Sequence, residues 1–158
     1  MRKTATLRVL ILVFGIMALY SYNAKNQTIN TLNQEPMNNY IAIVEIPVTD
    51  TDRAREFYEK VMGLTLEQHK MPGMEMALFP YENQQVAIVL LKSEGYRPTA
   101  EGTTIYLNTG KDLQPILDRA SKLGGQILTP KTAHADGSGF FALFLDSEGN
   151  RIGLHATH

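Results

Sequence analysis

The chain has 158 residues, of which 44% are hydrophobic, and its formal net charge is −1. A chain of this length can bury one sizeable core, so we expect a single folded domain. No block of Lys or Arg offers the basic face that nucleic-acid phosphates require, so we expect no nucleic-acid partner. The absence of cysteine excludes disulfides, thiolate metal sites and cysteine nucleophiles.

Residues 1–24 have the pattern of a targeting segment. Arg2, Lys3 and Arg8 precede the uncharged run Val9 to Tyr20, as in the charged and apolar regions of a signal peptide. The run is shorter than the roughly 20 apolar residues of a membrane-spanning helix, although its neighbours could extend it. We therefore predict a signal peptide or an N-terminal membrane anchor, and a protein that is exported (periplasmic or secreted) or attached to the membrane.

Residues 25–39 are rich in Asn, Gln and Thr and contain little that a core could bury. This composition predicts a flexible linker. The folded domain is therefore predicted to cover residues 40–158.

The first half of this domain, about residues 40–92, has a β-α-β-β-β pattern. Tyr40 to Pro47 is a short apolar run typical of a buried strand, and Thr49 to Asp52 offer oxygens that can cap a helix. Helical spacing then relates Ala54, Phe57, Tyr58 and Val61, and Gly63 ends the pattern. Three more strands are predicted at residues 64–70, 75–79 and 85–91.

The second half, about residues 103–156, repeats this order. It predicts a strand at 103–108, a helix after Asp112, and strands at 126–129, 139–145 and 151–156. Asp50 and Asp112 are 62 positions apart, as are Gly63 and Gly125, which indicates an internal duplication. We therefore predict an α+β domain of two fused β-α-β-β-β modules that enclose a cleft.

Three segments resemble the vicinal oxygen chelate superfamily, which includes glyoxalase I, extradiol dioxygenases, fosfomycin-modifying enzymes and bleomycin-binding proteins. They are VTDTDRAREFYEKVMGL (Val48 to Leu64), IYLNTGKDLQPILDRASKLGGQILTPK (Ile105 to Lys131) and FFALFLDSEGNRIGLH (Phe140 to His155). The resemblance covers Tyr40 to His158 and implies a glyoxalase-like cleft between curved mixed sheets, and a homodimer. It does not assign a reaction, because this scaffold hosts lyases, isomerases, oxygenases and pure binders.

Enzymes of this superfamily hold a divalent metal with His, Glu or Gln side chains from the first and fourth strands of each module. Carried over by resemblance, these places are Ile43 and Ile105 in the first strands, and Val89 and Gly153 in the fourth. None of the four carries the oxygen or imidazole donors that such a metal needs. We therefore expect no metal and no other cofactor, and we expect these four residues to line a cleft for a small organic molecule.

Glu45 and His155 are the candidate catalytic residues. Strand alternation places Glu45 on the face of Ile43 and His155 on the face of Gly153. A carboxylate and an imidazole in one cleft could transfer protons on a carbonyl-bearing substrate, as a lyase or isomerase does. The alternatives are a salt bridge from Glu45 to Arg97 or Arg151, and an ordinary histidine at a strand end.

Further candidates for ligand binding are His134 and Met76. His134 lies in a Gly-rich loop that could close over the cleft, or it is an exposed loop residue. Met76, with Met71 and Met74, could form a soft wall for an apolar ligand, or simply pack. Tyr106 is expected on the helix-facing side of its strand, opposite Ile105.

Three functions are compatible with these patterns. The first is a metal-independent protein that binds a small molecule and uses Glu45 and His155 as a lyase or isomerase. The second is a non-catalytic protein that binds or sequesters such a molecule. The third is a metal-dependent lyase or dioxygenase with relocated ligands such as Glu45 and His155.

Overall fold

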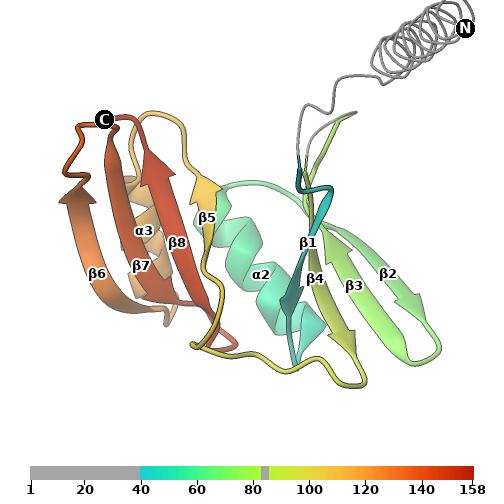
Figure 1. The fold of residues 1–158 in the computed structure, drawn as a ribbon. Helices are drawn as coiled ribbons and strands as arrows, with labels where there is room; N and C mark the ends of the chain where they lie inside the picture. The colour runs from blue at the N-terminus through green and yellow to red at the C-terminus, as the bar shows by residue number, and fades with distance from the viewer. Residues whose placement is uncertain (1–39, 83–85) are drawn as a thin grey trace, which may run out of the picture. The chain divides into compact units, whose positions relative to one another are not determined.

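The computed structural model describes residues 40–82 and 86–158, and Asn39–His158 form one compact unit (Figure 1). The predicted targeting segment (1–24) and linker (25–39) lie outside the described residues. Of the helices in residues 40–82 and 86–158, none is long and apolar enough to cross a membrane.

The first module contains β1 (Ile43–Pro47), α2 (Thr51–Met62), β2 (Glu67–Met71), β3 (Met74–Leu78) and β4 (Ala87–Ser93). Its strands form one sheet in the order β1-β4-β3-β2, in which β1 is parallel to β4 and the other pairs are antiparallel. Asp50 caps α2 by accepting a hydrogen bond from the Arg53 N–H, and Gly63 ends it with a left-handed φ of 72°.

The second module contains β5 (Ile105–Asn108), α3 (Gln114–Lys122), β6 (Gln126–Ala133), β7 (Phe140–Leu145) and β8 (Arg151–Ala156). Its sheet has the equivalent order β5-β8-β7-β6. The predicted α+β fold of two β-α-β-β-β modules is thus confirmed. Strand β6 runs past its predicted end because Pro130 is tolerated in an edge strand, where the pairing with β7 is interrupted by register shifts.

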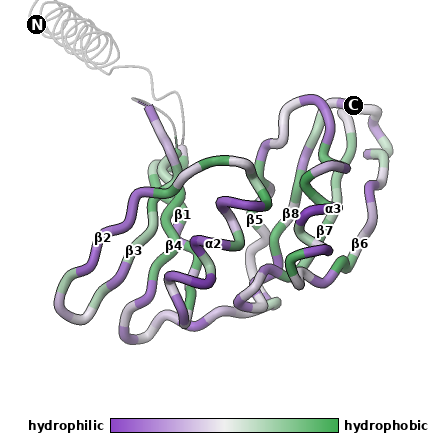
Figure 2. Tube along the Cα trace, turned by 180° about the vertical axis from the view of Figure 1, so that it is seen from behind, coloured by the Kyte–Doolittle hydropathy of each residue, from purple (hydrophilic) through white to green (hydrophobic). Residues whose placement is uncertain are grey.

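One core joins the two modules. Helix α2 lies between the two sheets in both Figure 1 and Figure 2, and its Phe57 and Tyr58 are almost fully buried. The Phe57 ring packs against Phe144 of β7 at a centroid distance of 6.3 Å, while the Tyr58 ring meets Phe79 at 5.5 Å. The apolar face of α2 is therefore covered by both modules.

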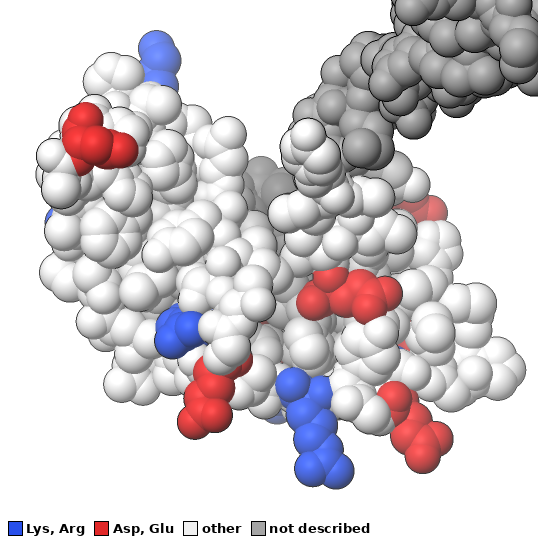
Figure 3. Space-filling model, viewed as in Figure 1, with Lys and Arg blue, Asp and Glu red and all other residues white. Residues whose placement is uncertain are grey.

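The outer strand β2 is mostly hydrophilic, as its colour in Figure 2 shows. Charged residues on an edge strand discourage pairing with another chain, so this edge is protected. On the face drawn in Figure 3, the Lys and Arg side chains lie apart from one another among acidic side chains.

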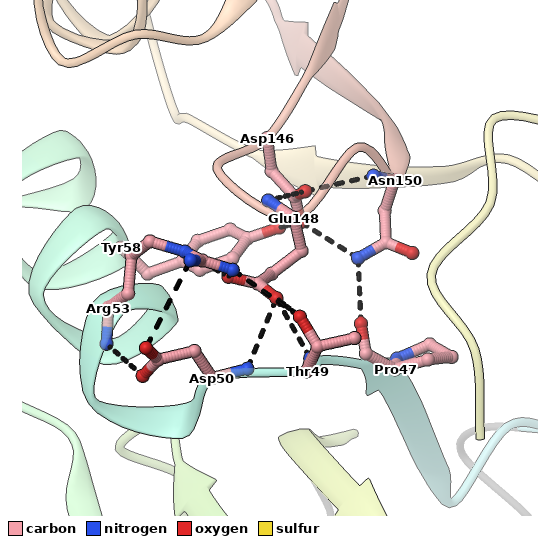
Figure 4. A network of polar contacts seen from close by, with 8 residues as sticks. All are labelled: Pro47, Thr49, Asp50, Arg53, Tyr58, Asp146, Glu148 and Asn150. Atoms are coloured by element: carbon pink, nitrogen blue, oxygen red, sulfur yellow. Dashed lines mark hydrogen bonds and ion pairs between the residues drawn. The ribbon is translucent and has the colours of Figure 1, made fainter.

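A cluster of hydrogen bonds, the inter-module clasp, connects the β7–β8 turn to the start of the first module (Figure 4). Its members are Pro47, Thr49, Asp50, Arg53, Tyr58, Asp146, Glu148 and Asn150. Glu148 Oε2 accepts hydrogen bonds from the backbone N–H and hydroxyl of Thr49, at 2.8 and 2.7 Å, and from the Asp50 N–H at 3.2 Å. Glu148 Oε1 accepts a hydrogen bond from Nε of Arg53 at 2.7 Å and forms an ion pair with its Nη2, also at 2.7 Å.

Asp146 and Asn150 complete the clasp. The buried hydroxyl of Tyr58 donates to Asp146 Oδ2 at 2.8 Å, and Asn150 Nδ2 donates to the Pro47 carbonyl at 2.8 Å. Burial, reinforced by the neighbouring Asp146 charge, raises the pKa of Tyr58 well above its ordinary value. The phenol therefore stays protonated and remains a donor to Asp146.

Candidate functional site

Each sheet has one side packed on the core and one side that we call its open face. In the first sheet, Ile46, Ala77 and Leu90 belong to the core, so the alternate residues form the first open face. Its members include Ile43, Glu45, Glu67, His69, Met71, Met74, Met76, Leu78, Ala87 and Val89. In the second sheet, Leu107, Ile152 and Leu154 belong to the core. The second open face includes Tyr106, Asn108, Phe141, Leu143, Gly153 and His155.

Ile43 lies on the first open face and is 61% exposed. The strand register pairs it with Ala87, whereas Val89 pairs with Glu45. Val89 therefore shares the face of Ile43, but it is not directly opposite that residue. Neither Ile43, Ala87 nor Val89 offers a donor atom to a metal.

The expected place of Ile105 is wrong. Ile105 packs against the core, and its neighbour Tyr106, predicted to face the helix, lies on the second open face. The cause is one extra residue before the second helix: α2 begins at Thr51 and α3 at Gln114, a spacing of 63 and not 62. A shift of one residue moves every side chain of a strand to the other face.

Tyr106 covers Gly153, its partner in the register between β5 and β8. A Cβ added at Gly153 would meet Tyr106 Cγ and Cε1 at 2.6 Å, and Cδ1 closer still, so the ring lies face-on over this glycine. A side chain at position 153 and the present position of the Tyr106 ring are therefore mutually exclusive.

The four places that correspond between the modules are thus Ile43, Ala87, Tyr106 and Gly153. They offer one phenol and otherwise hydrocarbon or no side chain, which does not fit a divalent cation. Across residues 40–82 and 86–158, no group of three or more His, Cys, Asp or Glu side chains could hold a metal ion.

Glu45 has a partner that the sequence did not indicate. The Tyr96 hydroxyl donates a hydrogen bond of 2.6 Å to Glu45 Oε2. That hydrogen bond and the carboxylate charge raise the pKa of Tyr96 above its ordinary value. Arg151, one of the expected partners of Glu45, instead donates to the Thr104 hydroxyl and the Gly102 carbonyl.

His155 lies on the second open face beside two other rings. The centroid of its imidazole is 5.4 Å from that of His134, and the His134 ring is 4.9 Å from that of Phe141. His134 is half-buried, and its Nε2 atom is buried without a hydrogen-bond partner among the described atoms. The backbone N–H of His134 donates to the Gly139 carbonyl, which fixes the turn between β6 and β7.

Glu45 and His155 lie on open faces of different sheets. Within the part of the chain that the structure describes, no hydrogen bond, ion pair or ring contact joins them. In the described residues, each of the two therefore has its own partner, Tyr96 for Glu45 and His134 for His155.

Met76 is half-buried on the first open face, paired with His69 and Leu91. Met71 and Met74 line a surface hollow of about 320 Å³ beside Lys92. Two larger hollows occupy about 580 Å³ beside Glu67 and Leu78, and about 400 Å³ between α2 and the end of α3. Neither Glu45 nor His155 lines any of these three hollows.

Residues 40–154 match the model of the Glyoxalase/Bleomycin resistance protein/Dioxygenase superfamily. The chain belongs to this superfamily. No curated protein sequence matches the chain significantly.

Solved structures of the glyoxalase superfamily share the fold at low identity. A glyoxylase/bleomycin resistance protein/dioxygenase domain from Frankia sp. EAN1pec is 16% identical, with a TM-score of 0.60, over 76% of this chain and 98% of that one. TnmS3, an antibiotic binding protein from Streptomyces sp. CB03234, is 19% identical, with a TM-score of 0.56, over 75% and 95%. Glyoxalase I from Zea mays is 21% identical, with a TM-score of 0.54, over 73% of this chain; the chain spans 45% of that enzyme.

Proposed function

We propose that this protein binds a small organic molecule on the open faces of its sheets, without a metal ion and without changing the molecule chemically. The observation that carries the proposal is the face-on packing of Tyr106 over Gly153, the position that the resemblance to the superfamily aligns with a metal ligand. The similarity to a protein described as antibiotic binding supports the same function.

The proposal favours binding over catalysis for a geometric reason. A general acid and a general base must both reach the reacting atoms. Glu45 accepts a hydrogen bond from Tyr96, while His155 packs against His134 on the other sheet.

A proton-transferring lyase or isomerase is the second candidate, and it requires a homodimer. Ile43 and Tyr106 are 61% and 47% exposed on their open faces, and large exposed apolar side chains mark association surfaces. In such a dimer, the first open face of one copy would meet the second open face of the other and bring Glu45 to His155 of the second copy.

Export or membrane attachment through residues 1–24 belongs to the same proposal and rests on the sequence pattern alone.

Binding without metal is tested by two measurements on the purified protein. Elemental analysis after dialysis should find far less than one equivalent of zinc, nickel, manganese or iron. A thermal-shift screen of small aromatic and carbonyl compounds should find ligands that raise the melting temperature equally with and without EDTA. Stoichiometric metal, or stabilisation that EDTA abolishes, would contradict the proposal.

Matched variants locate the site and separate the two candidates. Tyr106→Ala should weaken a ligand found in the screen, whereas Tyr40→Ala, at a tyrosine that is 94% exposed, should not. If the protein is instead an enzyme, Glu45→Gln abolishes turnover of a carbonyl substrate and leaves its binding intact. Turnover by the wild type that Glu45→Gln removes would establish the second candidate.

A further inference from the structure

The second open face carries a set of rings that extends across three strands. Tyr106 of β5 lies face-on over Gly153 of β8, so one face of its ring is covered by backbone and the residue remains 47% exposed. Two strand positions further along β8, the rings of His155, His134 and Phe141 are adjacent, at centroid distances of 5.4 and 4.9 Å. Flat rings at such spacing suit a planar aromatic ligand, which gains from offset or edge contacts with each of them.

His134 Nε2 is the polar atom of this face that lacks a partner. It is buried and accepts or donates no hydrogen bond within the described residues. A buried polar atom without a partner destabilises the free protein, and a ligand that supplies the partner removes this cost.

A hydroxyl group fits this atom better than other oxygen groups do. A neutral imidazole nitrogen is a donor in one tautomer and an acceptor in the other. A hydroxyl can both accept and donate, so it pairs with either tautomer, whereas a carboxylate can only accept.

The remaining residues of the second open face favour a neutral ligand. Tyr106, Asn108, Phe141, Leu143, Gly153 and His155 carry no fixed charge; Arg151, at the start of β8 on the same face, is turned to the Thr104 hydroxyl and the Gly102 carbonyl. No fixed positive charge among these residues would compensate a buried carboxylate, whose desolvation is costly.

We infer that the second open face binds a planar, neutral hydroxyaromatic molecule, which stacks on Tyr106 and whose hydroxyl pairs with Nε2 of His134. This inference rests on the proposed function and names the ligand class of that site. Because Nε2 is buried in the free protein, a ligand reaches it only when neighbouring side chains move.

The experiment compares three probes by isothermal titration of the full-length protein in EDTA: 2-naphthol, 2-methoxynaphthalene and 2-naphthoate. They share one ring system and differ in the oxygen group. The wild type should bind 2-naphthol about five- to tenfold more tightly than 2-methoxynaphthalene, as one additional hydrogen bond provides. It should bind 2-naphthoate no better than 2-methoxynaphthalene.

Variants separate the contribution of the hydrogen bond to His134 from that of stacking on Tyr106. His134→Phe keeps a ring and removes the nitrogen, so it should abolish the preference for 2-naphthol while 2-methoxynaphthalene binds as before. Tyr106→Ala should weaken all three probes by about tenfold. His158→Phe, at an exposed histidine that follows β8 and belongs to neither open face, is the control and should change nothing.

Equal affinity of the wild type for 2-naphthol and 2-methoxynaphthalene, a preference for 2-naphthoate, or an unchanged preference in His134→Phe would overturn the inference. If none of the three probes binds but the screen yields other metal-independent ligands, this inference fails and the proposed function stands. If the screen also yields no ligand, both fail.

Discussion

Gly153 and Tyr106 occupy a space that only one side chain can fill. Gly153→Ala should lower the free energy of unfolding by about 1–3 kcal/mol, because the new methyl group would overlap the Tyr106 ring. Urea denaturation followed by circular dichroism measures this change.

The double variant Tyr106→Ala/Gly153→Ala should recover most of the loss relative to Tyr106→Ala alone. An additive cycle would show that the ring does not limit the size of residue 153. The backbone itself does not require glycine at this position, because Gly153 is not among the glycines with positive φ.

Tyr96 reports on the state of Glu45. Because the Glu45 carboxylate raises the pKa of the Tyr96 phenol above its ordinary value of 10.0, spectrophotometric titration of Glu45→Gln should show one tyrosine titrating at lower pH than in the wild type. Glu67→Gln, on the same open face, is the control. Because the pKa is raised on folding, the contribution of this contact to stability is present below about pH 10 and is lost as the pH rises through the pKa of folded Tyr96.

The sequence alone could place Glu45 and His155 on their strand faces, but it could not find their partners. Tyr96 belongs to the segment between the modules, 51 positions from Glu45, and no periodic pattern connects the two. His134 is a candidate from the sequence, but its packing against His155 depends on the extension of β6 to Ala133. A proline usually argues against a strand, so Pro130 concealed this extension in the sequence.

At the level of elements, the clasp fixes the first turn of α2. Glu148→Ala should lower the free energy of unfolding by about 1–3 kcal/mol, because the N–H groups of Thr49 and Asp50 and the Arg53 guanidinium lose a common acceptor. Thermal or urea unfolding measures the loss. Glu56→Gln, which removes the exposed ion pair with Lys60 on the same helix, is the matched control and should have little effect. Equal effects of the two variants would contradict a special role for Glu148.

The Glu148 carboxylate also makes the free energy of unfolding depend on pH, and the direction of the dependence follows from its pKa. Burial alone would raise the pKa of Glu148, but hydrogen bonds from Arg53, Thr49 and Asp50 outweigh it and hold the pKa below the ordinary 4.5. The stabilisation is therefore present above about pH 4.5 and is lost as the pH falls through the pKa of the folded state. Between pH 6 and pH 3, Glu148→Gln should lose less stability than the wild type does.

The order of elements could be predicted from periodicity, capping residues and the internal repeat, but the alignment of the repeats could not. Asp50 caps α2, whereas Leu113 takes the equivalent position before α3, and Asp112 instead accepts from the Gln114 N–H. The two aspartates look equivalent in the sequence, yet they occupy different positions relative to their helices. That shift of one residue places Tyr106, and not Ile105, on the second open face.

For the whole molecule, the core shared by the two modules predicts that they unfold as one cooperative unit. Phe57→Ala should lower the free energy of unfolding by about 3–5 kcal/mol, because Phe57 is 4% exposed and packs on Phe144 of the other module. Native-state hydrogen exchange should show β4 and β8 losing protection by the same amount. Loss confined to the first module would contradict a single unit.

The clasp also determines when the chain can fold during its synthesis. The N–H of Thr49, just before α2, finds its acceptor in Glu148, which is 99 positions later, and the Pro47 carbonyl finds its donor in Asn150, which is 103 positions later. Contacts of such sequence separation form late, because a long loop must close first. When only the first module has been synthesised, the N–H groups of Thr49 and Asp50 therefore lack the Glu148 acceptor, and the core lacks the side chains of the second module. The native fold can form only after the β7–β8 hairpin has been synthesised.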